Sequence, residues 1–134
     1  MKKLGLNHVA IAVKDLPSAL AFYEGQLGLR CDHRERVEDQ AVDAAIFGTG
    51  QGRIELICPF TPDSGVAKFL EKRGEGLHHI CIDVPDLEQA LAELKAGGLP
   101  LIDEKPRVGA GGSRIAFVHP KGGHGVLIEL RQAD

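Results

Sequence analysis

Four residues of this chain combine metal-binding side chains with strand-like, aliphatic surroundings. Two are histidines, His8 and His79, and two are glutamates, Glu55 and Glu129. Neutral imidazole and carboxylate groups suit a borderline divalent cation such as Co²⁺, Ni²⁺, Zn²⁺ or Mn²⁺. A carboxylate buried alone among aliphatic side chains loses several kcal/mol of hydration, so each glutamate needs a partner.

The four residues form two matching sets because the chain contains an internal repeat. Residues 6–16 align with residues 77–87 at a constant offset of 71 (79 − 8), which makes His8 and His79 equivalent. The glutamates lie in the strand-like segments 53–57 and 126–130, one near the end of each copy. This duplication predicts one shared metal site, although periodicity alone does not distinguish it from a buried ion-pair network.

Each copy is expected to place its histidine on the face opposite its aliphatic side chains. Alternating aliphatic residues after each histidine predict a strand, and side chains of a strand alternate between its faces. Helices are predicted at 16–26, 63–73 and 87–96, and further strands at 42–47, 53–57, 113–118 and 125–130. The predicted class is α+β: two tandem βαβββ modules that form a cupped mixed sheet around a metal site. Residues 1–134 would form one domain, with module one at about 4–60, the linking helix at about 63–73 and module two at about 76–132.

Composition excludes several classes of function. The 134 residues carry a formal net charge of −3 without a Lys/Arg run, which argues against nucleic acid as a partner. No window approaches the roughly 18 apolar residues of a membrane helix, and the first residues do not resemble a signal peptide. Three widely spaced cysteines fit reduced thiols. We therefore expect a cytoplasmic protein.

The sequence resembles the vicinal oxygen chelate (glyoxalase/dioxygenase) superfamily and, within it, the methylmalonyl-CoA epimerase family. The resemblance runs from Leu6 to Gln132. The narrower likeness depends on ELICP at 55–59, DSGVAKFL at 63–70, GEGLHHI at 74–80, DEKPR at 103–107, FVHPK at 117–121 and GVLIEL at 125–130.

This resemblance implies a function as well as a fold. It implies a metal-dependent homodimer that interconverts (R)- and (S)-methylmalonyl-CoA through an enolate, with an acyl-CoA as its substrate and Co²⁺ as the first choice of metal. His8, Glu55, His79 and Glu129 fall on the family's metal ligands, and the second of these positions is Gln in some epimerases and Glu in others.

The resemblance suggests Glu129 as the catalytic base but leaves the opposite-face acid open. Some family members carry Glu where this chain has Ala44. Asp43 would point to the other face unless a bulge shifts the strand register. Glu55 or a bound water is the remaining candidate for the second proton transfer.

Contacts to the CoA group are expected from cationic side chains and a glycine-rich loop. The candidates are Lys121, Arg107, Gly111 and Ser113, and an ordinary solvated loop is the alternative for each. Other histidines are interpreted as packing or loop residues: His78 on the far side of its strand, and His119 and His124 in a loop. His33 has no specific role in this interpretation.

Three rival functions share the fold. A glyoxalase I-type lactoylglutathione lyase uses the same ligand types, but its usual Asp-Pro-Asp-Gly turn is replaced here by the sequence at 119–122, HPKG. An extradiol dioxygenase needs only two His and one Glu. A non-catalytic small-molecule-binding relative would lack the full ligand set, which is present here.

Overall fold

The structure is a computed structural model, and it describes residues 5–134. The chain divides into two compact units. One consists of His8–His78, and the other combines the residues up to Asn7 with His79–Asp134. The predicted start of module one at residue 4 lies outside the described residues.

The first module follows the order strand, helix and three strands. Its elements are β1 (Gly5–Ala12), α1 (Leu16–Leu20), a π-helical turn η1 (Ala21–Gln26), β2 (Cys31–Val37), a 3₁₀ turn η2 (Glu38–Gln40), β3 (Val42–Phe47) and β4 (Arg53–Pro59), followed by the linking helix α2 (Gly65–Arg73). The strand order is β2-β3-β4-β1. β1 runs parallel to β4, and the other neighbours are antiparallel.

The second module repeats this arrangement. Its elements are β5 (Gly76–Val84), α3 (Leu87–Ala96), β6 (Arg107–Val108), a 3₁₀ turn η3 (Ala110–Gly112), β7 (Arg114–Val118) and β8 (Leu127–Gln132). The strand order is β5-β8-β7-β6, with β5 parallel to β8 and the other neighbours antiparallel. The same connectivity in both modules confirms the predicted α+β fold class with its mixed sheet.

Equivalent caps begin the helix of each module. The carboxylate of Asp15 accepts a hydrogen bond from the Ser18 backbone N–H at 3.1 Å, and Asp86 accepts one from Gln89 at 3.0 Å. Such side chains satisfy N–H groups that have no partner within the helix. The predicted helix at 16–26 is present, but its second half is π-helical, as the 2.8 Å bond from the Leu27 N–H to the Phe22 carbonyl shows.

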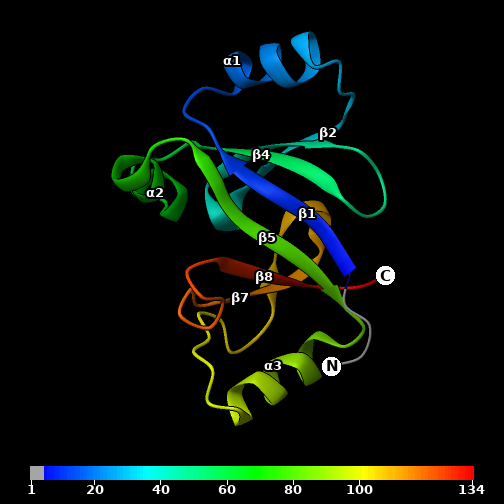
Figure 1. Cartoon of the computed structure of the whole chain (residues 1–134), viewed down its shortest axis with the longest axis vertical. Helices are drawn as coiled ribbons and strands as arrows, with labels where there is room; N and C mark the ends of the chain where they lie inside the picture. Colours follow the sequence, from blue (N-terminus) through cyan, green and yellow to red (C-terminus); the bar gives the residue numbers. More distant parts are fainter. Residues whose placement is uncertain (1–4) are drawn as a thin grey trace. The chain divides into compact units, whose positions relative to one another are not determined.

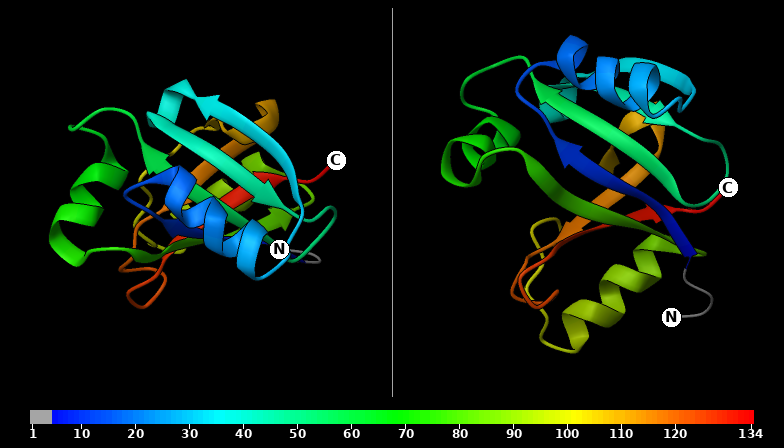
Figure 2. Two further views of the ribbon diagram at one scale, coloured as in Figure 1. Left: turned by 90° about the horizontal axis from the view of Figure 1, so that it is seen from above. Right: turned by 45° about the horizontal axis from the view of Figure 1, so that its top comes forward.

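Each helix covers one face of its own strands. α1 lies over β4 (Figures 1 and 2), and its apolar core includes Leu16, Ala45 and Leu56. α3 packs on β7 and β8 through a core that includes Leu91 and Leu130. Strand alternation therefore leaves a second face in each module, turned away from its helix. No helix in the described part of the chain is long and apolar enough to cross a membrane.

Candidate active site

In the first module, His8 and Glu55 lie together on the face turned away from α1. Glu55 is in register with Ala10 on β1, so the two side chains share a face with His8, whereas Leu56 faces α1. The exposed fractions of His8 and Glu55 are 7% and 6%. The His8 Nε2 atom lies 3.4 Å from Glu55 Oε2.

The second module contains an equivalent pair on the face turned away from α3. Glu129 is in register with Cys81, two residues after His79 on β5. The exposed fractions of His79 and Glu129 are 3% and 5%, and His79 Nε2 lies 3.2 Å from Glu129 Oε1. The structure therefore brings each histidine beside the glutamate of its own module.

The geometry within each pair suits two ligands of one cation. Imidazole nitrogen and carboxylate oxygen bind a transition metal at about 2.0–2.2 Å, which puts neighbouring ligand atoms about 3.0–3.4 Å apart for angles between octahedral and tetrahedral. The measured separations of 3.4 and 3.2 Å fall in that range. His8, His79 and Glu129 are all buried, and each offers an atom that could bind a metal ion. A bound cation would also offset the cost of burying the carboxylates.

An aromatic ring and an arginine adjoin the pair of the second module. The Phe117 ring meets the His79 ring edge to face, with centroids 5.6 Å apart, and Phe117 is directly opposite Glu129 in the sheet. The Arg107 guanidinium lies 6.0 Å from the centre of the Phe117 ring, and its Nη1 is 3.4 Å from Asp103. A role for Phe117 is not predictable from the sequence, because its position two strands from His79 depends on the register of β5, β8 and β7.

A different pair of polar residues shares the face of His8 and Glu55 in the first module. His33 and Glu35 lie on β2, and His33 Nε2 is 2.9 Å from Glu35 Oε1. Glu35 is directly opposite Ala44, and His33 is opposite Ile46, which in turn is opposite Glu55. These residues were missed because β2, at Cys31–Val37, has too many charged residues to be predicted as a strand.

Asp43 occupies the other face of β3. Its carboxylate accepts bonds from Arg36 Nε at 2.8 Å and Nη2 at 3.1 Å. The hydrogen bonds from Arg36 lower the pKa of Asp43, against an opposing effect of burial and with a further attraction from the Arg36 charge. β3 pairs with β4 without a break from Val42 to Phe47, and the register shift lies instead in β2. Asp43 is thus directed away from Glu55.

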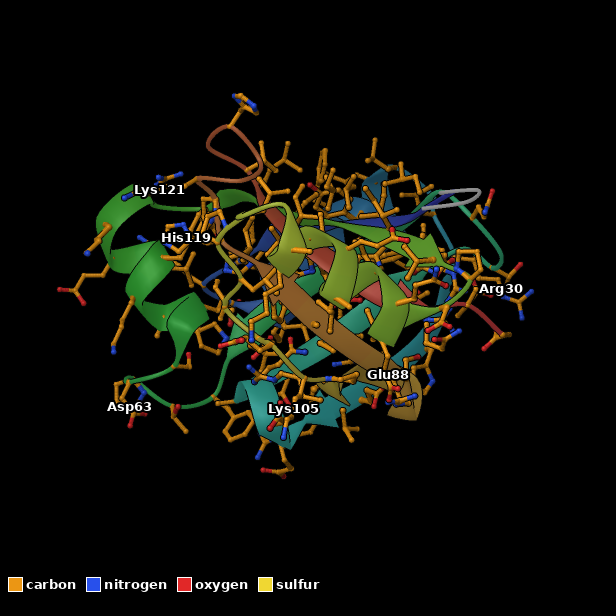
Figure 3. The ribbon with its side chains drawn as sticks, turned by 90° about the horizontal axis from the view of Figure 1, so that it is seen from below. Arg30, Asp63, Glu88, Lys105, His119 and Lys121 are labelled. Atoms are coloured by element: carbon orange, nitrogen blue, oxygen red, sulfur yellow. The ribbon has the colours of Figure 1, made fainter. Side chains whose placement is uncertain are left out.

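The four residues considered for CoA binding have different surroundings. Arg107 is in register with Ile115 and shares the face of Phe117. Lys121 is exposed on the loop after β7, where its backbone N–H donates to His119 Nδ1 at 3.1 Å (Figure 3). The Ser113 hydroxyl oxygen accepts a 3.0 Å bond from Arg131 Nε, and Gly111 adopts a left-handed conformation in η3.

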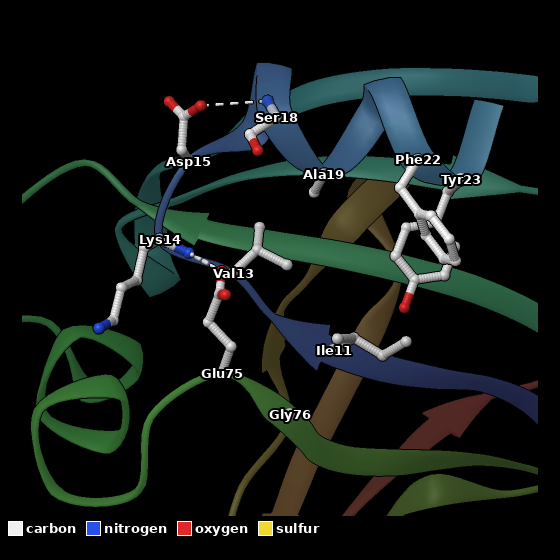
Figure 4. Close-up of a pocket in the computed structure, with 10 residues that line it drawn as sticks. All are labelled: Ile11, Val13, Lys14, Asp15, Ser18, Ala19, Phe22, Tyr23, Glu75 and Gly76. Carbon is white, nitrogen blue, oxygen red and sulfur yellow. Dashed lines mark hydrogen bonds between the residues drawn. The ribbon is translucent and has the colours of Figure 1, made fainter. Parts of the chain in front are cut away.

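The pocket shown in Figure 4 is separate from these polar faces. It lies between α1, β1 and the start of β5, with a volume of about 490 Å³. Ile11 and Val13 line it, and both pack in the core beneath α1. Glu75 closes one side by accepting a 2.8 Å bond from the Lys14 backbone N–H. This pocket therefore opens on the face opposite His8 and Glu55.

Comparison with known proteins agrees with the fold. Residues 7–117 match the model of the Glyoxalase/Bleomycin resistance protein/Dioxygenase superfamily. The chain is 40% identical over 129 residues to the ethylmalonyl-CoA/methylmalonyl-CoA epimerase of Cereibacter sphaeroides, covering 95% of this chain and 96% of that protein. It is also 40% identical over 129 residues to mitochondrial methylmalonyl-CoA epimerase of Homo sapiens, with coverages of 96% and 73%.

A solved epimerase structure is also similar to this chain. A variant of Streptomyces coelicolor methylmalonyl-CoA epimerase in complex with 2-nitronate-propionyl-CoA has a TM-score of 0.92 at 36% identity, covering 98% of this chain and 96% of that chain. The chain belongs to the Glyoxalase/Bleomycin resistance protein/Dioxygenase superfamily and, within it, to the methylmalonyl-CoA epimerase family. Lactoylglutathione lyase GLX1 of Arabidopsis thaliana is more distant, at 26% identity over 117 residues, with coverages of 87% and 41%.

Proposed function

We propose that this chain is an epimerase that interconverts (R)- and (S)-methylmalonyl-CoA through an enolate intermediate. The observation that carries the proposal is a buried His–Glu pair at equivalent positions of two repeated modules. Membership of the epimerase family supports the same reaction. Epimerisation requires removal of the proton on the carbon between thioester and carboxylate, followed by return of a proton to the opposite face.

The proposed cofactor is one divalent cation held jointly by His8, Glu55, His79 and Glu129. Co²⁺ is our first choice, with Ni²⁺, Zn²⁺ and Mn²⁺ as alternatives. In this proposal the two modules, at about 4–60 and 76–132, form one domain that shares the ion. The cation would supply positive charge beside the thioester and carboxylate oxygens, where negative charge develops in the transition state. The burial and the nitrogen-to-oxygen spacing of both pairs support this assignment.

Glu129 is the proposed base. This residue is only 5% exposed beside His79, so little water competes to protonate an enolate, and the exposed part allows the proton on Glu129 to exchange with solvent. Glu55 is the equivalent carboxylate of the first module and the second catalytic candidate. Both carboxylates are held by strands whose other face packs in a core, so their positions are fixed before substrate binds.

Arg107 is proposed to bind an anionic group of the acyl-CoA substrate. It lies on the face of Phe117 and Glu129, and a guanidinium can hold a carboxylate or phosphate with two parallel bonds. Lys121 would add positive charge from its exposed loop. Ser113 keeps its hydroxyl hydrogen available to a ligand because its oxygen accepts from Arg131, and Gly111 would allow close approach of the ligand to the backbone.

The proposed cellular form is a cytoplasmic homodimer. Phe22, Leu27 and Leu77, in the unit His8–His78, are exposed apolar side chains of the kind that contact with a second copy would bury. Cys31 and Cys58 are free thiols, as is the buried Cys81, which suits a reducing compartment. Size-exclusion chromatography with light scattering would test the dimer.

Proton exchange would test the proposed reaction. The purified chain, loaded with Co²⁺ and stripped of it in parallel, would be incubated with each epimer of methylmalonyl-CoA in D₂O and followed by NMR. We expect metal-dependent epimerisation with deuterium entering at the substrate carbon, and no isomerisation of the methylglyoxal-glutathione adduct. Absence of epimerisation in the loaded protein would refute the proposed function, and turnover of the adduct alone would establish the lyase.

A further inference from the structure

The proposed reaction needs a proton donor on the face of the substrate carbon opposite Glu129. We propose that Glu35 on β2 is this second proton-transfer residue, and that His33 orients it. This inference rests on the proposed function and names a residue for its unassigned step. It depends on the register of three strands within the first unit.

The register places Glu35 on the same face of the sheet as Glu55. Directly opposite residues of an antiparallel pair share a face, with Cβ atoms about 4.5–5.5 Å apart. Glu35 is opposite Ala44, whose exposed fraction is 1%, and the next row across the sheet runs from His33 through Ile46 to Glu55. The helix α1 covers the other face, so it does not separate the two glutamates.

Ala44 is small, and its exposed fraction of 1% shows that neighbouring side chains cover it. Glu35, directly opposite on β2, provides a carboxylate beside this position on the face of Glu55. β2 and β4 are two strand spacings apart, or about 10 Å, and an extended glutamate covers roughly half of that. The proposal places the substrate carbon on this face between β4 and β2, with Glu35 acting from the β2 side.

The environment of Glu35 suits repeated proton transfer. Its side chain is 24% exposed, and the neighbouring His33 side chain is 53% exposed. Their 2.9 Å contact fixes the carboxylate, and the exposed imidazole connects it to solvent. Glu35 is thus sheltered enough to act on a bound substrate and can still recover a proton from water.

The proposed step is balanced in protons and electrons. Glu129 takes the proton from the substrate carbon, and the electron pair of that C–H bond enters the enolate. The protonated carboxyl of Glu35 then gives its proton to the opposite face, forming the new C–H bond. Glu129 loses its proton to water and Glu35 regains one, which restores the starting state. In the reverse direction the two residues exchange roles.

Substitution of Glu35 should slow inversion of the substrate carbon while exchange of that carbon's proton with solvent continues. In D₂O, E35Q is expected to epimerise at least about 100-fold more slowly than the wild type, since general acid–base groups contribute about 10²- to 10⁴-fold. The epimer whose proton faces Glu129 should still take up deuterium at the substrate carbon without being inverted. The amount of metal bound by the variant should equal that of the wild type. E38Q, an exposed glutamate in η2, is the matched control and should behave as the wild type.

The outcomes distinguish this inference from the proposed function. Wild-type epimerisation in E35Q, or equal loss of exchange from both epimers in a folded and metal-loaded E35Q, would overturn the role of Glu35. If E35Q does not fold, His33→Ala tests the same pair: we expect epimerisation about tenfold slower with retained exchange, and an unchanged rate would overturn the inference. A wild-type protein that cannot epimerise at all refutes the proposed function instead.

Discussion

The two modules provide the same pair of potential ligands in different surroundings. In both, a histidine of the first strand lies within 3.4 Å of a glutamate of the last strand, and both side chains are buried. The pair of the second module contacts Phe117, with Arg107 beyond it. The pair of the first module shares its face with His33, Glu35 and the small Ala44.

This difference separates the His–Glu pairs, which both modules have, from the neighbouring residues, which are particular to one module. Two equivalent pairs are needed if each module contributes half of one coordination sphere. The neighbours can diverge because the proposed substrate is not symmetric: each module is proposed to supply one proton-transfer carboxylate, and the second module is also proposed to bind the anionic part of the ligand. We therefore interpret the second module as the side of the base and of substrate binding, and the first as the side of the returning proton.

The largest effect is expected from loss of either histidine. His8→Ala and His79→Ala should each weaken metal binding at least about 100-fold and abolish measurable epimerisation, because each removes a proposed ligand of the same ion. Elemental analysis after dialysis against a chelator would measure bound metal. His124→Asn, on an exposed loop with positive φ that Asn tolerates, is the control. Stoichiometric metal in either alanine variant would show that the two pairs do not share one ion.

The two glutamates should differ more than the two histidines. Glu129→Gln should slow epimerisation about 10²- to 10⁴-fold because an amide cannot accept the proton. Glu55→Gln should cost less than about tenfold if its role is to bind the cation, since an amide oxygen remains a ligand. Steady-state kinetics of both epimers, with metal content measured in parallel, would test this. Equal losses in the two variants would contradict the assignment of Glu129 as the base.

A smaller effect is expected from Arg107. Arg107→Met should raise KM for the acyl-CoA about ten- to 100-fold with little change in kcat, because a bond to a charged group contributes about 1.5–3 kcal/mol to binding. Arg114→Met is the matched control: Arg114 is exposed on β7 and pairs with Glu88 at the start of α3. A fall in kcat at unchanged KM would instead place Arg107 in the chemical step.

Much of this arrangement could be predicted from the repeat. The constant offset relates the two helices, their caps and the two histidines, because each feature depends on neighbouring residues. α3 has the predicted limits, Leu87–Ala96. The α+β class follows from the order of these elements, and residues 7–117 match the superfamily in which it was expected.

Features that depend on pairing between distant segments could not be predicted. β2 contains Asp32, Arg34 and Arg36 among its seven residues. Apolar and polar residues therefore do not alternate along it, and this alternation is the sequence signal of a strand. Its partner across the sheet, and hence the position of Glu35 opposite Ala44, is set by the turn at η2 and by the register shift near His33. The ring contact between Phe117 and His79 likewise depends on the pairing of β5 with β8 and of β8 with β7.

The smallest expected effect tests the register on which the comparison depends. Asp43→Asn removes the pair with Arg36 on the α1 face, so we expect a slight decrease in the thermal unfolding temperature at neutral pH and unchanged epimerisation. Because the hydrogen bonds from Arg36 lower the pKa of Asp43 in the folded protein, its stabilising effect is present above the usual pKa of an aspartate and is lost as pH falls through the lowered value. The difference between wild type and variant should therefore vanish in strong acid.

Thermal melts across pH and epimerase assays on the same samples would provide both measurements for Asp43→Asn. Loss of epimerisation comparable to that of E35Q would mean that β3 is shifted by one residue, since such a shift exchanges the faces of Asp43 and Ala44. In that case Asp43 would be the carboxylate on the face of Glu55, and Glu35 would lie opposite a different row. Unchanged epimerisation in Asp43→Asn would support the register described above. In that register, Glu35 of β2 and Glu55 of β4 are the carboxylates on the face turned away from α1, and Asp43 of β3 lies on the other face.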